Sequence, residues 1–296
     1  MAEDRTRILS KEFLAGPGAI VLDELHKYHR WKNWLKGLYD RDGKRIRVVV
    51  TGSARLDIFQ RAGDSLFGRH ELLRMHPLSI GELTGNRLPP PPGDWQRPGR
   101  GDETNPRAAW NQLKRRGGFP EPFFRDNDLQ HQRWSTRRRE LLIRQDLRDL
   151  TEIRLLSLVE NLAILLTNRA ANVLSLNSLR EELTVAHDTI SSWIEALERI
   201  YFCYRISPYS KKIARSLKKE PKLYLWDWSQ IREPGWRFEN MIASHLLKAV
   251  HAWNDIGHGE FALHYWRDTG KREVDFVITS QREPVVAIEC KTSDTT

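Results

Sequence analysis

Two adjacent acids, Asp23 and Glu24, end a short apolar run in GAIVLDEL. An aspartate at the carboxyl end of a buried strand can hold Mg²⁺ through water, and a glutamate beside it can align and polarise the water that attacks a γ-phosphate. A strand that ends in acids is a weak signal by itself, because many surface strands end this way. The pair therefore needs support from residues elsewhere in the chain.

That support comes from polar residues that follow the next apolar run. IRVVV leads into Thr51, Gly52 and Ser53, and SLFGR then presents Arg69. In the P-loop fold, the strand beside the acidic one commonly ends in a polar residue that senses the γ-phosphate. An arginine in the position of Arg69 is a candidate for stabilising charge on a transferring phosphoryl group.

A second set of residues, near the C-terminus, could bind a metal. Glu239 lies in a predicted helix, Asp275 in the strand EVDFVITS, and Glu289-x-Lys291 at the end of the next strand. This is the layout of the PD-(D/E)xK nuclease core, in which a hairpin brings Asp and Glu together on Mg²⁺ and Lys orients or activates water. The pattern predicts the fold more strongly than it predicts cleavage, because many proteins with this fold bind without cutting.

The elements around the first acids indicate an α/β fold. Residues 19–23 and 46–53 are short continuous apolar runs, which suit strands of a covered parallel sheet. The stretch between them has apolar residues at helical spacing and ends at a turn signal, Asp42-Gly43. A strand, a helix and a second strand in this order predict a right-handed parallel unit.

The middle of the chain changes character. Residues 84–106 are rich in proline and glycine and predict an exposed loop or linker, and residues 110–150 are mostly helical and basic. Three helices are predicted within 152–200, with Ser175 or Asn177 capping the second and Asp188 the third. The segments YFCYRISPYS and KLYLWD follow as two strands, and this order fits a winged helix-turn-helix.

Composition narrows the possible partners. The chain has 48 Lys and Arg against 39 Asp and Glu, a net charge of +9 and a pI of about 9.6, which favours a polyanion such as DNA. The run of arginines at 137–139 could contact such a polyanion, or it could simply form a solvated helix face. No apolar run approaches the roughly 20 residues of a membrane helix, and no signal peptide is visible. With two distant cysteines, we expect a cytoplasmic protein that does not enter the membrane.

The quoted motifs, with VLDELHKYHRWKNWLKGLYD, VVVTGSARLDIF and GDSLFGRHELLRMHPLSIGEL in this order, resemble the AAA+-related bacterial and archaeal ATPases. The resemblance implies a Walker B pair at Asp23 and Glu24, a sensor at Thr51 or Ser53, and a finger-like Arg69. It implies ATP and Mg²⁺ as cofactors. It also implies a winged-helix segment and a nuclease-like C-terminal domain after the ATPase core, with Mg²⁺ ligands at Glu239, Asp275 and Glu289.

The chain departs from this family at the phosphate-binding loop. The Walker A pattern GxxxxGK[ST] wraps phosphates with backbone amides and a lysine, and no segment matches it. Residues 15–18, AGPG, lack the lysine, and residues 42–45, DGKR, come after Asp23. We therefore expect a truncated member of the family, in which ATP binding and hydrolysis are impaired.

The sequence thus predicts an α/β protein in four parts. These are a partial AAA+ ATPase core at 1–88, a linker with basic helices at 89–150, a winged-helix segment at 151–228 and an incomplete nuclease-like domain at 229–296. The favoured function is an ATP-binding protein associated with DNA. The alternatives are a Mg²⁺-dependent nuclease and a non-catalytic regulator that binds DNA or protein, and either a protein partner or a homo-oligomer is compatible with the sequence.

Overall fold

The computed structural model of the protein describes residues 18–25, 28, 30–43, 45–52, 68–85, 89–93, 106–147, 156–211, 219–268, 270 and 272–292. The chain divides into two compact units, Met1–Glu71 and Leu72–Thr296. Both units combine helices and strands, which agrees with the α/β class expected from the sequence. Within these ranges no helix has both the length and the apolar character needed to cross a membrane.

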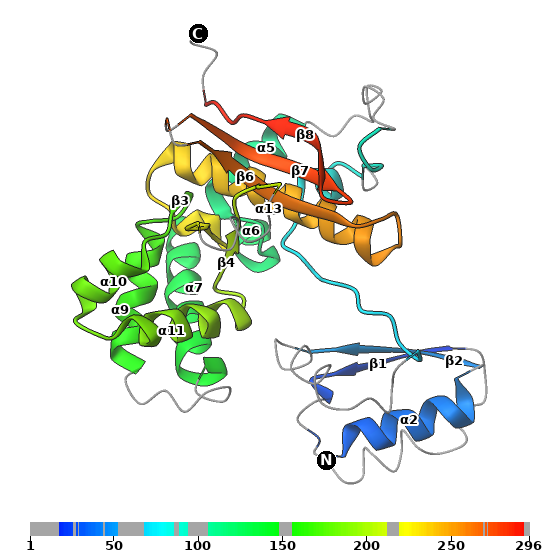
Figure 1. The fold of residues 1–296 in the computed structure, drawn as a ribbon. Coiled ribbons are helices and arrows are strands. Elements are labelled where there is room, and N and C mark those ends of the chain that lie inside the picture. The colour runs from blue at the N-terminus through cyan, green and yellow to red at the C-terminus, as the bar shows by residue number, and fades with distance from the viewer. Residues whose placement is uncertain are drawn as a thin grey trace. The chain divides into compact units, whose positions relative to one another are not determined.

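The first unit contains a β-α-β arrangement of β1 (Gly18–Asp23), α2 (Trp31–Asp42) and β2 (Ile46–Thr51), shown in blue in Figure 1. The two strands are parallel, as the two apolar runs predicted. Side chains alternate across each strand, so one face of the pair packs against the apolar stripe of α2. That small core consists of Ile20, Trp34, Leu35, Leu38, Ile46 and Val48.

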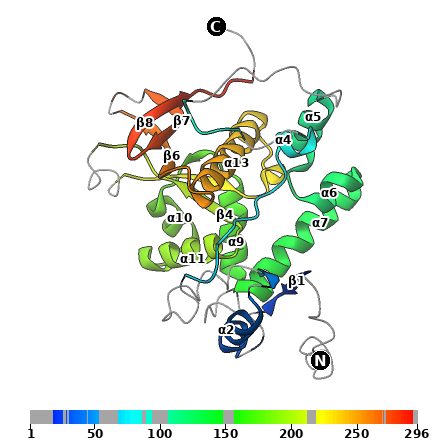
Figure 2. The ribbon, with the colours of Figure 1, turned by 90° about the vertical axis from the view of Figure 1, so that its right-hand side faces the viewer.

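The second unit opens with helices. A short helix, α4 (Ile80–Leu83), lies close to α5 (Pro106–Arg116) and α13 (Pro234–Asp255) in Figure 2. Next come α6 (Pro120–Arg125) and α7 (Asp128–Leu141), which continues into the π-helical segment η2 (Leu142–Leu147). Three of these helices, α5, α6 and α13, begin with proline, whose missing N–H costs nothing in the first turn.

The middle of the second unit is a set of helices with a small sheet. Its elements are α9 (Leu156–Thr167), β3 (Asn172–Val173), α10 (Leu176–Leu183), α11 (His187–Arg199), β4 (Cys203–Ile206) and β5 (Lys222–Leu225). The strands pair in the antiparallel order β3-β5-β4.

Ser175 occupies the N-cap position of α10, one of the two residues expected there. The expectation that Asp188 caps the next helix is wrong, because the extended backbone of Ala186 already precedes α11. Asp188 lies instead in the first turn, where a negative charge interacts favourably with the helix dipole.

The C-terminal part places α13 against a three-stranded antiparallel sheet (Figure 1). After η3 (Trp228–Gln230) and α13 come β6 (Phe261–Arg267), β7 (Glu273–Ser280) and β8 (Glu283–Ile288), paired in the order β6-β7-β8. The chain that follows β4 attaches to this sheet. The N–H of Tyr209 donates to the carbonyl of Tyr265 at 2.6 Å, and the N–H of Tyr265 donates to the carbonyl of Ser207 at 3.3 Å.

β5 belongs to two hydrophobic cores at once. Leu223 and Leu225 point into the helical core formed with α5, α9, α10 and α11. Tyr224 and Trp226 point the other way, into the core that α13 forms with β6 and β7. Successive side chains of a strand point to opposite faces, which explains this division. Lys222 lies two positions before Tyr224 and therefore points to the same side, toward α13 and β7.

Candidate functional site

The carboxyl edge of the first unit brings three of the predicted residues together. Asp23 is paired in register with Thr51, because the two parallel strands end at the same edge. The Thr51 hydroxyl donates a hydrogen bond to Oδ1 of Asp23 at 2.5 Å, and the Glu24 N–H donates to the carbonyl of Thr51 at 3.0 Å. Glu24 has a φ of 52°, in the left-handed region. Such a backbone costs on the order of 1 kcal/mol and is frequent at functional sites.

Arg69 lies at a different place in the same unit. Its Nε is 3.3 Å from Oδ1 of Asp40, near the C-terminal end of α2. Because β1 and β2 are parallel, α2 must run back from the carboxyl edge of β1 to the amino edge of β2. Asp40 and Arg69 are therefore at the edge opposite Asp23. Ser53, the other candidate sensor, lies outside the described residues.

The residues at the carboxyl edge are compatible with Mg²⁺. This ion prefers hard oxygen ligands and usually keeps several waters while it binds one or two carboxylates. Asp23 is exposed at the strand end, and a hydroxyl from Thr51 fixes one of its oxygens. Asp23 would hold the ion through water, and Mg²⁺ would supply charge neutralisation for a bound triphosphate.

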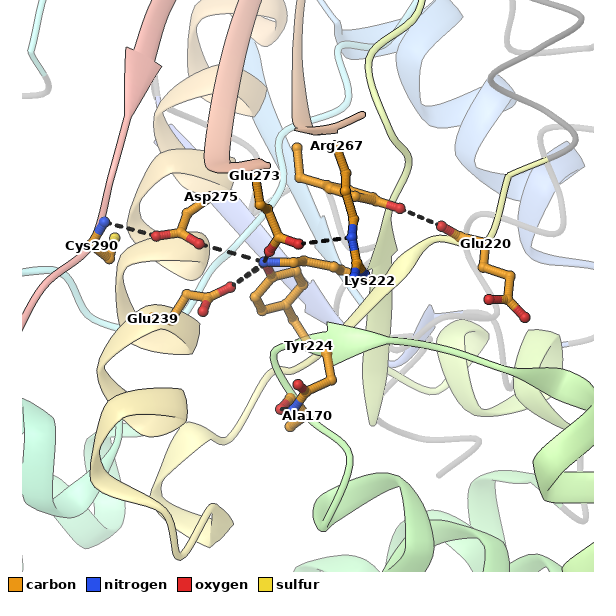
Figure 3. A network of polar contacts seen from close by, with 11 residues as sticks. Ala170, Glu220, Lys222, Tyr224, Glu239, Arg267, Glu273, Asp275 and Cys290 are labelled. Carbon is orange, nitrogen blue, oxygen red and sulfur yellow. Dashed lines mark hydrogen bonds and ion pairs between the residues drawn. The ribbon is translucent and has the colours of Figure 1, made fainter. Parts of the chain in front are cut away.

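The second site is centred on Lys222 and is drawn in Figure 3. Its acidic members, here called the carboxylate cluster, are Glu239, Glu273 and Asp275. Glu239 comes from α13, and the other two come from β7, where positions two apart share one face of the strand. The sites expected from the sequence at Glu239 and Asp275 are thus neighbours in space.

Lys222 contacts all three acids. Its Nζ lies 3.0 Å from Oε1 of Glu239, 2.5 Å from Oε1 of Glu273 and 3.5 Å from Oδ1 of Asp275. The Tyr224 hydroxyl also donates to Oε1 of Glu239, at 2.9 Å. Figure 3 shows these side chains converging from β5, α13 and β7.

Burial and charge act against each other in this cluster. The Lys222 side chain is only 3% exposed. Burial alone would lower the pKa of Lys222, but the carboxylates of Glu239 and Glu273 outweigh that effect and raise it. Burial raises the pKa of Glu239, against the opposing attraction of Lys222. The ammonium group therefore stays charged at neutral pH.

The side chains of Glu289 and Lys291 take no part in the contacts described for the carboxylate cluster. β8 ends at Ile288, and it is the backbone N–H of Cys290 that donates to Oδ2 of Asp275, at 2.8 Å. The side chains of Glu289 and Lys291 are exposed. Among the described residues, no group of three or more His, Cys, Asp or Glu side chains is arranged to hold a metal ion.

Sequence reasoning missed Lys222, Tyr224 and Glu273 as members of this site. The alternation in KLYLWD could have indicated that Lys222 and Tyr224 share a face. It could not have identified α13 and β7 as the elements on that face, because these residues come together only when β5 joins both cores.

Three family models match successive parts of the chain. An AAA domain model matches residues 2–84, a Domain of unknown function (DUF8612) matches residues 107–231, and a Domain of unknown function (DUF4143) matches residues 234–296. The matches at the two ends support an AAA-related, ATPase-like family.

Similar curated proteins are themselves uncharacterized. Uncharacterized protein Rv2008c of Mycobacterium tuberculosis and uncharacterized protein Mb2031c of Mycobacterium bovis are each 21% identical over 274 residues. The aligned region covers 90% of this chain and 57% of each relative, so the chain spans little more than half of their length. No solved structure matches the chain.

Proposed function

We propose that the first unit supplies the Walker B half of an ATP-binding site. In this proposal Asp23 holds Mg²⁺ through water, Glu24 orients the attacking water, and Thr51 is the polar sensor of the neighbouring strand. The observation that carries the proposal is the hydrogen bond between Thr51 and Asp23 at the shared carboxyl edge of two parallel strands. The AAA domain match over residues 2–84 supports it independently.

A polypeptide of these 296 residues should bind ATP weakly. It contains no GxxxxGK[ST] segment to wrap the phosphates. Each charge-assisted contact to phosphate is worth roughly 1.5–3 kcal/mol, so the loss of several removes most of the affinity. Hydrolysis by this polypeptide should be correspondingly feeble.

Hydrogen exchange with and without excess Mg·ATP tests the nucleotide site. We expect added protection in peptides that cover 18–25 and 45–52, and its loss in Asp23→Asn. Asp42→Asn, at the end of α2 and the opposite edge of the sheet, is the matched control and should keep the protection. Protection that is absent, or that is unchanged by Asp23→Asn, would refute the Walker B assignment.

The position of Arg69 adds a proposal on assembly. At the edge opposite Asp23, paired with Asp40, it is badly placed to serve the site of its own unit. A finger arginine can act in trans, so we propose that Arg69 serves a second copy of the chain. Sedimentation velocity with excess Mg·ATP should then detect self-association, and a strictly monomeric chain would refute this role.

The second unit supports association with nucleic acid. The element order from α9 to β5, with the sheet order β3-β5-β4, is compatible with a winged helix-turn-helix, which we propose for this region. Its second long helix, α11, exposes Asp188, Glu195 and Arg199. Two acids on that surface are unfavourable beside phosphates, so we propose that α11 does not read bases in the major groove.

A more suitable surface for phosphates lies on α7. Arg133 and Arg137 are exposed one turn apart, and with Gln132, Thr136 and Glu140 they line a shallow depression. Contacts of this kind give affinity without reading sequence. We propose that α7 contacts the DNA backbone.

Fluorescence anisotropy with a labelled duplex over a range of salt concentrations tests this surface. Replacing both Arg133 and Arg137 with Gln should weaken binding and reduce the slope of log K against log salt by about 2. Arg199→Gln on α11 is the control and should change little. Binding that is absent or insensitive to salt would refute association with DNA.

A further inference from the structure

The position of Lys222 decides what the carboxylate cluster can bind. A divalent cation needs the free lone pairs of several oxygens at 2.0–2.6 Å, roughly the range for Mg²⁺ and Ca²⁺. Here one oxygen from each of Glu239, Glu273 and Asp275 lies within 3.5 Å of a single ammonium nitrogen. An ammonium group has three N–H donors, so each acid can accept one of them.

Each acid also has a second protein partner, on the oxygen that Lys222 contacts in Glu239 and on the other oxygen in Asp275 and Glu273. The hydroxyl of Tyr224 donates to Glu239, and the N–H of Cys290 donates to the second oxygen of Asp275. The guanidinium Nε of Arg267 lies 3.6 Å from the second oxygen of Glu273. Two basic side chains therefore face three acids, and each acid has a partner beyond Lys222.

A metal entering this cluster would meet a fixed positive charge. Lys222 cannot swing into water easily, because its side chain is 3% exposed and its backbone is paired with Ile206 and Val173 in the sheet. Like charges repel strongly where water is excluded. Mg²⁺ or Mn²⁺ could bind only by expelling the lysine from the carboxylates.

We propose that Lys222 is a built-in cation that takes the place of a divalent metal in this nuclease-like arrangement. The ammonium group ties β5 to α13 and β7, so the cluster joins the two cores of the second unit and holds no metal. A site for Mg²⁺ is latent there, because removal of the lysine would leave three carboxylates directed at one point. This inference is independent of the nucleotide site proposed for the first unit.

Titration of the full chain with Mn²⁺, followed by electron paramagnetic resonance, tests the first half of the proposal. We expect no Mn²⁺ to bind at the carboxylate cluster of the wild-type chain, so replacing Asp275 with Asn should not change its Mn²⁺ binding. Wild-type Mn²⁺ binding that Asp275→Asn abolishes would overturn the proposal, whatever the Lys222 variants do. The wild-type titration therefore gives a result that does not depend on the folding of any Lys222 variant.

The latent site is tested with Lys222→Ala and, should that variant fold poorly, with Lys222→Met, which keeps the apolar stem. Either variant should melt at a lower temperature than the wild type. Saturating Mn²⁺ should bind at one site of the variant and raise the variant's melting temperature by roughly 5 °C. Adding Asp275→Asn to the variant should remove both effects. A folded Lys222 variant that binds no Mn²⁺ would overturn the claim that lysine occupies a metal position.

Two exposed lysines provide matched controls. Lys219 donates to the carbonyl of Arg267 at 3.3 Å, beside the cluster, and Lys291 is the lysine of the sequence motif. Lys219→Ala and Lys291→Ala should bind Mn²⁺ no better than the wild type. A Mn²⁺ site created equally by any of the three lysine replacements would indicate a general charge effect and would contradict the specific role of Lys222.

Discussion

His76 and His251 form a direct pair, with Nε2 of His76 lying 2.9 Å from Nδ1 of His251. One ring must donate and the other accept, so the pair requires at least one neutral imidazole. His76 belongs to the segment 74–82, here called the α13 strap, which runs along α13 in the opposite direction. Figure 2 shows α4, the end of this strap, beside that helix.

Polar contacts hold the strap along most of its length. Nη1 of Arg74 lies 2.6 Å from Oδ1 of Asp255 at one end, and the N–H of Ile80 donates to Nε2 of His245 at 3.1 Å at the other. Lys248 lies between them, where it donates to the carbonyl of Pro77 at 3.0 Å and contacts Glu82. The histidine pair is thus enclosed by groups of both charges.

Acid should destabilise the second unit through this pair. Burial lowers the pKa of His76 to about 3, with added effects of His251, Lys248 and Arg74 and opposition from Glu82. Burial and Arg74 lower the pKa of His251 to about 4, against Asp255. The unfolded chain therefore takes up protons below about pH 6.5 before the folded chain does. Stability is full above that pH and declines as the pH falls toward 4.

Urea unfolding at pH 7.5 and at pH 5 measures this loss. We expect the free energy of unfolding to drop on the order of 2 kcal/mol for each histidine. His251→Gln should reduce the drop by its own share, on the order of 2 kcal/mol. Burial also lowers the pKa values of His131, His245 and His264, which contribute to the remainder. His258→Gln, an exposed histidine at the end of α13, should leave the drop unchanged. Equal pH dependence in the wild type and His251→Gln would contradict the assignment to this pair.

Gly118 is a position where a single methyl group should be costly. A Cβ there would lie 2.6 Å from Cη2 of Trp228, 2.7 Å from Cβ of Pro77 and 2.9 Å from the carbonyl oxygen of Leu78. None of these neighbours is a flexible side-chain end, so the strap or η3 would have to move. Gly118→Ala should lower the free energy of unfolding by about 1–3 kcal/mol.

Gly37→Ala is the contrasting replacement. Gly37 is an exposed residue within α2, and apart from its chain neighbours and the backbone of its own helix no described heavy atom lies within 4 Å of an added Cβ. Alanine is favoured over glycine in a helix interior by up to about 1 kcal/mol, so we expect no loss of stability. Denaturation curves of both variants decide the matter, and a harmless Gly118→Ala would show that the strap does not pack tightly at that point.

Asn240 and Asn254, four turns apart on α13, make the same pair of hydrogen bonds to two different strands. The side-chain amide of Asn240 bonds to both backbone groups of Leu225 in β5. It accepts a hydrogen bond from the Leu225 N–H and donates one to the Leu225 carbonyl, both at 2.8 Å. Asn254 does the same to Phe261 of β6, again at 2.8 Å. The difference is burial, because Asn240 is 0% exposed and Asn254 is only partly buried.

Burial should therefore set the cost of removing each amide. Asn240→Ala leaves two backbone groups without partners where water does not reach, and should cost roughly 2–4 kcal/mol. Water can replace the side chain of Asn254, so Asn254→Ala should cost about 1 kcal/mol. Thermal or urea unfolding compares the two directly. Equal losses would mean that water reaches Leu225 as readily as Phe261.

Local patterns predicted the elements well and their assembly poorly. The apolar runs at 19–23 and 46–50 were sufficient to locate the parallel pair. The expected cover on both faces is wrong, because Val21 and Val49, on the face away from α2, are 65% and 48% exposed. The EVD strand was also located correctly, as β7. These features depend on neighbouring residues along the chain.

The cluster around Lys222 could not be predicted in the same way. The sequence assigned β5 to the wing of a winged helix, and nothing in that strand indicates that its first residue, Lys222, is buried. The acids that stabilise the buried ammonium group lie 17 to 53 residues farther along the chain. The positions of Glu289 and Lys291 depend on where β8 ends, and strand ends are poorly determined by pattern. The strap on α13 shows the same limit, as His76 and His251 are 175 residues apart.

The hydroxyl of Thr51 offers the most selective change at the nucleotide site proposed for the first unit. Thr51→Val keeps the shape and the strand preference of the side chain but removes its hydrogen bond to Asp23, which is exposed and worth about 1 kcal/mol or less. Thr51→Ser keeps the hydroxyl. Both variants should therefore fold with nearly unchanged stability.

Their response to Mg·ATP should differ, because only the hydroxyl can fix the Asp23 carboxylate at the shared strand edge. We expect Thr51→Val to lose most of the nucleotide-dependent protection of residues 18–25 in hydrogen exchange, and Thr51→Ser to retain it. The unliganded exchange pattern of each variant serves as the control for local unfolding. If valine and serine gave the same protection, the carboxylate would not need the hydroxyl, and Thr51 would have a structural role at the end of β2 in place of a sensing one.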